Sequence, residues 1–237
     1  MVRISVIGIG YKSLDKETRE KLYTSEAIFA SQRLFDIFKR YEEFEVVKDR
    51  IQVINNADET VDLMRSRISD LRSHLVVLAS GDPLFSGIGR RVLDEFGKEM
   101  VEIIPDLSSI QIAFARIKEP WDDAFFMSLH RGPDARKRRT LKYEVSDIPS
   151  ILIEHETIAI LTDRENNPAK IAQEILHSSA DNRQPSSLGI YVCEKLGYPD
   201  EKITAGSPEY ISQMEFSEPN VVIIKRNAMV KGKQQTA

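Results

Sequence analysis

Three short segments carry residue types that bind small ligands, and each directly follows an apolar run typical of a β-strand. They are Gly8-Ile9-Gly10, Ser80-Gly81-Asp82-Pro83 and Pro105 to Ser109. Glycine lets a backbone approach a ligand closely, and ligands bind at the carboxyl ends of the strands in parallel sheets. These positions therefore indicate a shared site for one small molecule.

The first two segments also fit purely structural roles. Gly8 and Gly10 fit a tight turn, because Ser13 stands where a dinucleotide fingerprint has its third glycine. Asp82 precedes a proline and is held out of the α region. That conformation either presents its carboxylate to a ligand or lets it cap a type I turn. The residues alone leave both alternatives open.

The third segment opens a predicted helix. Asp106, Ser108 and Ser109 are residue types that cap helices, and capping is their ordinary role. Their place after a third strand, beside the other two loops, is what favours a role in ligand binding.

Metal and nucleophile motifs are absent from the sequence. The four histidines and the one cysteine lack ligand spacing, His155-Glu156 lacks the second histidine of a zincin motif, and there is no Gly-x-Ser-x-Gly elbow. We therefore expect no metal. His130 is kept as a candidate because it ends a predicted strand.

The composition is that of an ordinary globular chain. Its 237 residues include 33 Lys+Arg and 37 Asp+Glu, and the net charge of -4 argues against a surface built for nucleic acid. Cys193 is the single cysteine, which excludes cysteine-rich zinc modules and favours a reducing compartment. No apolar run approaches the roughly 20 residues that span a bilayer, and the N-terminus lacks signal-peptide features. The sequence predicts a cytoplasmic protein with no membrane partner.

One segment departs from this charge balance. Between Arg131 and Lys142 there are six basic residues and a single acid, Asp134. Such a run is usually a solvated helix face or loop, and its alternative role is to attract an anionic ligand. The basic residues are Arg131, Arg136, Lys137, Arg138, Arg139 and Lys142.

Apolar strand-like runs alternate with helix-period segments, which predicts an α/β fold. Around Pro120 the pattern breaks, so we place a boundary after residue 118 and expect two α/β domains, 1–118 and 119–237. The predicted strands are Ile4 to Gly8, Ala27 to Ala30, Val46 to Lys48, Leu75 to Ala79, Val101 to Ile104, Phe125 to Leu129, Thr157 to Leu161, Leu188 to Cys193 and Val221 to Lys225.

Helices are predicted from spacing and from capping residues. Apolar stripes run through 57–71 and 107–117, and Asn55 or Asn56 caps the first of them. Asn167-Pro168 and Ser207-Pro208 each place a capping side chain before a proline, which predicts two further helix starts.

Taken together, these segments resemble the tetrapyrrole methylase family of S-adenosylmethionine-dependent enzymes, and the resemblance covers essentially the whole chain. The three loops occur in the order and spacing of that family's cofactor loops. The branch that methylates C5 of the precorrin ring is the most similar. The residues that carry this resemblance are Leu78 to Gly89, Pro105 to Arg116, Pro120-Trp121, Ser128-Leu129-His130, Leu161-Thr162-Asp163, Asn167-Pro168 and Cys193 to Gly197.

The resemblance implies two α/β domains with S-adenosylmethionine in the cleft between them, and a homodimer. It also implies a precorrin or cobalt-precorrin substrate and a separate partner that decarboxylates and methylates at C15. The implied cofactor contacts are Gly8, Gly10, Gly81, Asp82, Leu84, Phe85, Ser108, Ser109, Leu129, Thr162, Glu194 and Pro219.

Methyl transfer from a sulfonium requires alignment and exclusion of water more than acid or metal catalysis, which fits the missing metal motifs. A proton must later leave the methylated ring, and Asp106, His130 and Glu194 are the candidate acceptors. The substrate bears several carboxylates, which gives the basic segment a purpose. Its candidate contacts are Arg131, Arg136, Arg138 and Arg139.

Two other functions stay open. The chain could be another family member, with a different ring position or with a diphthine-type protein substrate. An RNA-associated protein using residues 131–142 is the second alternative, and the balanced charge argues against it.

Overall fold

The computed structural model describes residues 3–68, 74–130, 141–179, 188–226 and 233–236. The chain forms two compact units, Met1–Ser108 and Ser109–Ala237. Each unit has its own β-sheet with helices packed on it, so the predicted α/β class is confirmed. The division between the units falls after Ser108, ten residues before the predicted boundary, so the helix over 109–117 belongs to the second unit. A domain boundary after residue 118 stays a prediction.

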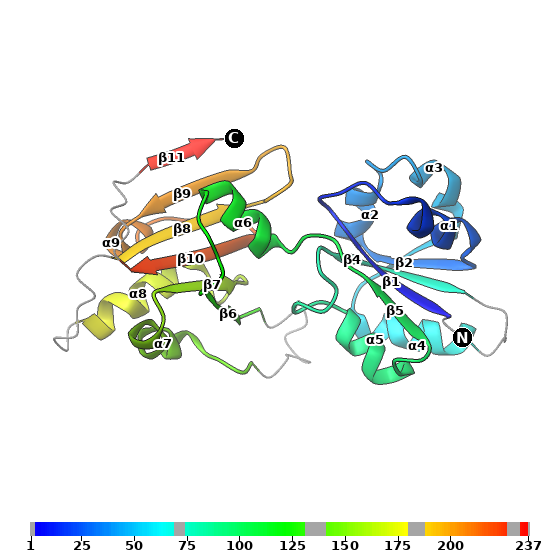
Figure 1. The fold of residues 1–237 in the computed structure, drawn as a ribbon, viewed down its shortest axis with the longest axis horizontal. Helices are drawn as coiled ribbons and strands as arrows, with labels where there is room; N and C mark the ends of the chain where they lie inside the picture. Colours follow the sequence, from blue (N-terminus) through cyan, green and yellow to red (C-terminus); the bar gives the residue numbers. More distant parts are fainter. Residues whose placement is uncertain (1–2, 69–73, 131–140, 180–187, 227–232, 237) are drawn as a thin grey trace. The chain divides into compact units, whose positions relative to one another are not determined.

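The first unit contains a sheet of five parallel strands in the order β3-β2-β4-β1-β5. The chain leaves β1 toward β2 and leaves β4 toward β5, in opposite directions across the sheet. Because such crossovers are right-handed, the intervening helices lie on opposite faces, and Figure 1 shows α1 to α3 on one face and α4 and α5 on the other. The carboxyl ends of β1 and β4 are therefore the place where such a sheet binds ligands. The elements are β1 (Ile4–Ile9), α1 (Lys16–Thr24), β2 (Ala27–Ser31), α2 (Gln32–Phe38), α3 (Phe44–Val47), β3 (Ile51–Ile54), α4 (Ala57–Arg67), β4 (Leu75–Ser80), α5 (Gly89–Phe96) and β5 (Val101–Ile104).

Local chemistry explains where these helices begin. The Asp15 carboxylate accepts the Thr18 amide at the start of α1, and Asn56 accepts the Glu59 amide at the start of α4. Asn56 is thus the cap that the sequence left undecided. Strands β1 and β4 are mostly apolar and show no alternation of buried and exposed residues, because helices cover both faces of the sheet.

The predicted strand over Val46 to Lys48 is wrong. These residues lie in α3 and in a short 3₁₀ turn over Lys48–Arg50, and the strand is β3 at Ile51–Ile54. Val46 is 63% exposed while Val47 is buried, so the short apolar run covers only one side of a helical turn. An apolar run of this length does not distinguish a strand from a helix.

The second unit contains a sheet of six strands in the order β11-β9-β8-β10-β7-β6. Only β6 and β7 pair in parallel, and the other neighbours are antiparallel. Helices α7 and α8 bury their apolar stripes against β6, β7, β8 and β10. The elements are α6 (Ser109–Ile117), β6 (Phe125–Ser128), α7 (Ile148–Glu154), β7 (Thr157–Leu161), α8 (Pro168–Ser179), β8 (Leu188–Glu194), β9 (Lys202–Gly206), α9 (Pro208–Ile211), β10 (Asn220–Arg226) and β11 (Lys233–Thr236), with a 3₁₀ turn over Val145–Asp147.

Both predicted proline starts are confirmed. Helix α8 begins at Pro168 and its Lys170 amide donates to Asn167, while α9 begins at Pro208 and is capped by Ser207. Strands β9 and β11 were not predicted, because neither carries a long β-branched run. Within the described ranges, every helix is too short or too polar to cross a membrane.

Candidate functional site

The structure brings the three predicted loops of the first unit into direct backbone contact. The Gly81 amide donates to the Ile9 carbonyl at 3.0 Å, and the Asp106 amide donates to the Gly81 carbonyl at 3.2 Å. A Cβ atom added to Gly8 would lie 1.9 Å from the Gly81 oxygen and 2.6 Å from the Asp106 nitrogen. The ends of β1, β4 and β5 therefore meet at a point where only glycine fits.

The two remaining predicted glycines have different surroundings. Gly81 has a φ of +56°, and a Cβ there would lie 2.6 Å from the Leu107 oxygen. Gly10 has a φ of +134° and no atom lies within 4 Å of an added Cβ. Gly81 is therefore required for packing, whereas Gly10 borders open space that leaves room for a ligand.

The loop after β4 supports the structural interpretation of Asp82. The Oδ1 atom of Asp82 accepts the Leu84 amide at 2.8 Å. This bond closes the local turn that an aspartate before proline favours. The Leu84 side chain is 49% exposed, so the turn presents an apolar group next to Phe85. On the third loop, Ser108 and Ser109 are half-buried at the start of α6.

Asp106 is buried, with 8% of its surface exposed, and it connects two loops. Its Oδ2 accepts the Tyr11 amide at 2.7 Å and the Lys12 amide at 3.2 Å, and its Oδ1 accepts the Leu107 amide at 2.7 Å. These three bonds occupy both oxygens, which weakens the case for Asp106 as a proton acceptor.

Tyr41 is a residue that the sequence reasoning missed. Its hydroxyl accepts the Gly10 amide at 2.7 Å. Burial of the phenol raises the pKa of Tyr41, and the nearby Asp106 charge acts in the same direction. No signal in the sequence pointed to Tyr41, because it follows α2 in a segment without a motif.

In the second unit, the predicted contacts Leu129 and Thr162 lie at strand ends that are tied together. The Leu129 amide donates to the Leu161 carbonyl at 2.8 Å, and its own carbonyl accepts the Asn166 side-chain amide at 2.9 Å. The Thr162 hydroxyl lies 2.9 Å from the Asn220 backbone oxygen. Buried polar contacts therefore join the carboxyl ends of β6 and β7 to the start of β10. Asn166, which makes one of these contacts, is a second residue that the sequence reasoning missed.

Glu194 ends β8 and is also buried. Its Oε1 accepts the Ser217 amide at 2.7 Å, while Oε2 has no hydrogen-bond partner among the described residues and lies 3.9 Å from the Lys202 ammonium. Next to it, the Lys195 amide donates to the Pro219 carbonyl at 2.8 Å. Glu194 thus holds the segment before β10, and in this conformation its free oxygen is not accessible from solvent.

The remaining predicted residues fall into two groups. His130 is exposed just after β6, and its backbone amide lies 3.4 Å from the Ser128 hydroxyl. Arg131, Arg136, Arg138 and Arg139 lie in 131–140, outside the described residues, so their role stays a prediction. The described residues contain no cluster of three or more histidine, cysteine, aspartate or glutamate side chains that could hold a metal.

Cys193 is a clear case of a buried, unreactive thiol. Burial raises its pKa to about 12, and the Glu201 and Glu194 charges act in the same direction. Because the thiolate is the reactive form, we expect a thiol reagent at pH 8 to label the native protein at least about 100-fold more slowly than the urea-unfolded protein. Fast labelling of the native protein would contradict the buried placement.

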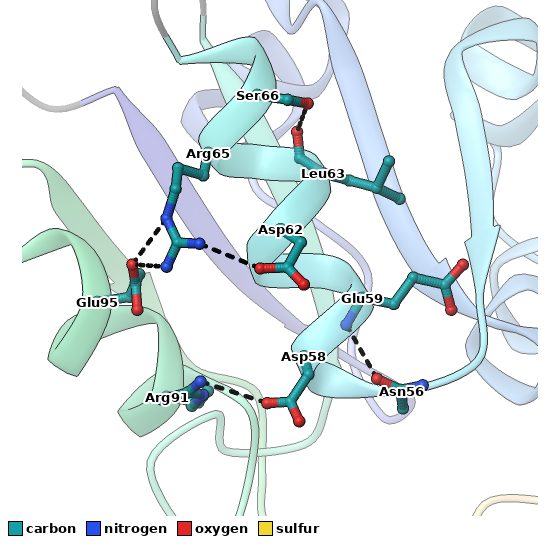
Figure 2. A network of polar contacts seen from close by, with 9 residues as sticks. All are labelled: Asn56, Asp58, Glu59, Asp62, Leu63, Arg65, Ser66, Arg91 and Glu95. Carbon is teal, nitrogen blue, oxygen red and sulfur yellow. Dashed lines mark hydrogen bonds and ion pairs between the residues drawn. The ribbon is translucent and has the colours of Figure 1, made fainter.

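Ion pairs between α4 and α5 hold the helix that follows the Gly81 loop (Figure 2). Arg65 pairs with Glu95 on α5 and with Asp62 on its own helix, and Arg91 pairs with Asp58. The Arg65 side chain is 57% exposed, so Arg65→Ala is expected to lower the free energy of unfolding only slightly. Urea unfolding in low and high salt tests this, since the difference should shrink in 1 M salt. A loss that is large and independent of salt would contradict the exposed geometry.

Comparison with known proteins assigns the family. Residues 3–210 match the model of the tetrapyrrole (corrin/porphyrin) methylases, so this chain belongs to that family and is a methyltransferase. It is 26% identical to a probable cobalt-precorrin-7 C(5)-methyltransferase of Methanocaldococcus jannaschii, over 93% of this chain and 96% of that protein. It is also 33% identical to a cobalt-precorrin-7 C(5)-methyltransferase of Salmonella typhimurium, over 54% of this chain and 55% of that protein.

Two solved structures share the fold. A cobalamin biosynthesis precorrin-6Y methylase from Archaeoglobus fulgidus has a TM-score of 0.66 and 17% identity, covering 96% of this chain and 98% of that one. A cobalt precorrin-4 methyltransferase has a TM-score of 0.67 and 14% identity, covering 94% of both chains. The two-unit architecture is therefore that of known tetrapyrrole methylases.

Proposed function

We propose that this chain uses S-adenosylmethionine to methylate C5 of precorrin-7 or cobalt-precorrin-7 in cobalamin biosynthesis. The observation that carries the proposal is the similarity to a probable cobalt-precorrin-7 C(5)-methyltransferase over 93% of this chain, added to the family match. The convergence of the three strand-end loops supports it, because backbone-lined loops at the carboxyl ends of parallel strands suit a small ligand.

The loop residues fit a cofactor of this size. The backbone at Gly10 borders open space, and Leu84 offers an exposed apolar surface near the end of β4. We assign cofactor contacts to the predicted residues of the three loops. They are Gly8, Gly10, Gly81, Asp82, Leu84, Phe85, Ser108 and Ser109. When bound, S-adenosylmethionine supplies an electrophilic methyl group, so the chain's task is to align the ligands and exclude water.

Proton removal from the methylated ring is assigned among the three predicted acceptors. Asp106 has both oxygens occupied by amide bonds, and Glu194 is buried with one oxygen bound to the Ser217 amide. His130 is exposed and is therefore the first of the three to substitute. Histidine is also the side chain that most often acts as a general base in enzymes.

The deciding experiment is anaerobic incubation of the chain with S-adenosylmethionine and either precorrin-7 or cobalt-precorrin-7. We expect a product that is one methyl group heavier, with a new methyl signal at C5 by NMR. Cofactor binding without product from either form would point to another family member, including one that forms diphthine. Retention on RNA that falls steeply with salt would favour the RNA-binding alternative.

The remaining implied properties stay predictions with their own tests. Light scattering tests the homodimer, and co-purification with a C15-methylating decarboxylase tests the separate partner. The predicted placement of the cofactor between two domains requires a structure with the cofactor bound. Charge reversal at Arg136, Arg138 and Arg139 should weaken substrate binding if these residues bind carboxylates.

A further inference from the structure

Three consecutive amides in the loop after β1 are bound by side chains from elsewhere in the first unit. The Gly10 amide donates to the Tyr41 hydroxyl at 2.7 Å. The Tyr11 and Lys12 amides both donate to Oδ2 of Asp106, at 2.7 and 3.2 Å. A glycine-containing loop at this place in a parallel sheet commonly offers such amides to an anionic ligand.

We infer that Asp106 is a built-in anion that occupies the amides of Tyr11 and Lys12 and fixes the loop after β1, as a positioning residue for the proposed methyl transfer. Its carboxylate stands where a phosphate or carboxylate of a ligand would otherwise bind. The loop is then shaped before the cofactor arrives, and these three amides are not offered to an external anion.

The same residue also connects the other two loops. Oδ1 of Asp106 accepts the Leu107 amide at 2.7 Å, and the Asp106 backbone amide donates to the Gly81 carbonyl at 3.2 Å. Bonds from amides to a buried carboxylate are stronger than bonds between neutral groups, because charge and a low local dielectric both strengthen them. Removing the charge therefore releases the β1 loop and loosens its connection to the ends of β4 and β5.

The positioning role of Asp106 rests on the proposed function only where it concerns cofactor binding. A proton acceptor at this position would lose its bond to the Leu107 amide if Oδ1 took the proton, or its bonds to the Tyr11 and Lys12 amides if Oδ2 did. A positioning residue instead acts through cofactor affinity and loop order. The two roles therefore differ in what is lost when the carboxylate is removed.

The test is chemical rescue of Asp106→Ala by formate, a carboxylate small enough to replace the missing side chain. We expect the variant to melt at a lower temperature than the unmodified chain, and formate to raise the melting temperature in a saturable way. Chloride at the same ionic strength should not. In 15N-labelled protein, the Tyr11 and Lys12 amide signals should shift on substitution and return with formate. Affinity for S-adenosylmethionine, measured by calorimetry, should fall at least about tenfold and recover in parallel.

Asp15→Ala is the matched control. Asp15 is also an aspartate that accepts backbone amides, but its principal bond is to Thr18 at the start of α1, outside the three loops. This variant should lose some stability and show no saturable response to formate. A similar response in both variants would mean a general salt effect and would overturn the inference.

A second variant covers the case in which Asp106→Ala does not fold. Asp106→Asn keeps the size but offers one acceptor oxygen instead of two, so the signals of Tyr11 and Lys12 or that of Leu107 must shift. Unchanged signals would overturn the inference. Unchanged cofactor affinity with kcat reduced more than about 100-fold would also overturn it, in favour of a proton acceptor. If no cofactor binds to the unmodified chain, the proposed function fails, while the melting and NMR results still decide the role of Asp106.

Discussion

Gly8→Ala is expected to lower the free energy of unfolding by about 3 kcal/mol and to abolish cofactor binding. The added Cβ would lie 1.9 Å from the Gly81 oxygen and 2.6 Å from the Asp106 nitrogen, and both are backbone atoms that cannot rotate away. The three strand ends must therefore separate, which disrupts the loops that we assign to the cofactor. Urea unfolding and calorimetric titration with S-adenosylmethionine measure the two effects.

Gly97→Ala provides the matched control for this prediction. Gly97 has a φ of +79°, so alanine there is strained, but no atom lies within 4 Å of an added Cβ and the residue ends α5. We expect a loss of about 1 to 3 kcal/mol from backbone strain alone, with unchanged cofactor affinity. If Gly8→Ala binds the cofactor as well as Gly97→Ala does, the assignment of the β1 loop to the cofactor is wrong.

Asn166→Asp is expected to cost about 3 kcal/mol at pH 7 and to weaken cofactor binding about tenfold. The Asn166 side-chain amide donates to the Leu129 carbonyl at 2.9 Å, and the residue is only 2% exposed. Aspartate has the same shape but places a second acceptor against that carbonyl. The effect on binding follows because Leu129 is one of the predicted cofactor contacts.

The pH dependence of this variant gives a sharper test. Burial against the Leu129 carbonyl disfavours the charged form of the new carboxyl, whereas the Lys170 ammonium, 3.3 Å from the Asn166 side-chain oxygen, favours it. Because Lys170 is exposed and solvent weakens its attraction, we expect burial to dominate and the folded-state pKa of the new carboxyl to lie above its unfolded value. Its stability is then fully present below the unfolded pKa and is lost as the pH rises through the folded pKa. The variant should approach the unmodified chain near pH 4 and differ most at pH 7. Urea unfolding across this range measures the difference, and a constant difference would contradict the geometry.

The neighbouring Asn167→Asp is the control. The Asn167 side-chain oxygen accepts the Lys170 amide at the start of α8, and aspartate caps a helix as well as asparagine does. We expect a change within about 0.5 kcal/mol and little dependence on pH. The same chemical change at adjacent positions thus compares the buried Asn166, which donates to Leu129, with the half-buried cap Asn167, whose longer bond to the Arg164 carbonyl is 3.3 Å.

The sequence was most informative where one residue type has a local physical requirement. Gly8 and Gly81 were chosen because glycine lets a backbone approach a ligand closely. The structure shows that their missing Cβ atoms let the three loops approach one another, and the approach of a ligand stays a prediction. Asn167 and Ser207 were identified as caps because a cap acts within its own turn. Such requirements are visible without knowing the rest of the fold.

Other residues could not be predicted because their partners are distant in the sequence. Tyr41 contacts Gly10 and Asn166 contacts Leu129, each across more than thirty residues and without any motif. Asp106 was chosen from its place after a strand, but its bonds to Tyr11 and Lys12 suit a positioning role better than the predicted proton transfer.

The strand order of the first sheet also has a consequence for synthesis on the ribosome. Strand β1 pairs with β4 and β5, and Ile4 lies opposite Leu75, about 70 residues later. Strand β2 can pair with β3 much sooner after it is translated, because Ile28 lies opposite Ile51. At about 5 to 20 residues per second, roughly 4 to 14 s pass after the fully buried β1 is made before its partner β4 is translated. Among the strands of this sheet, β1 is therefore translated before the others but is among the last to be paired, and it needs protection from aggregation until β4 has emerged.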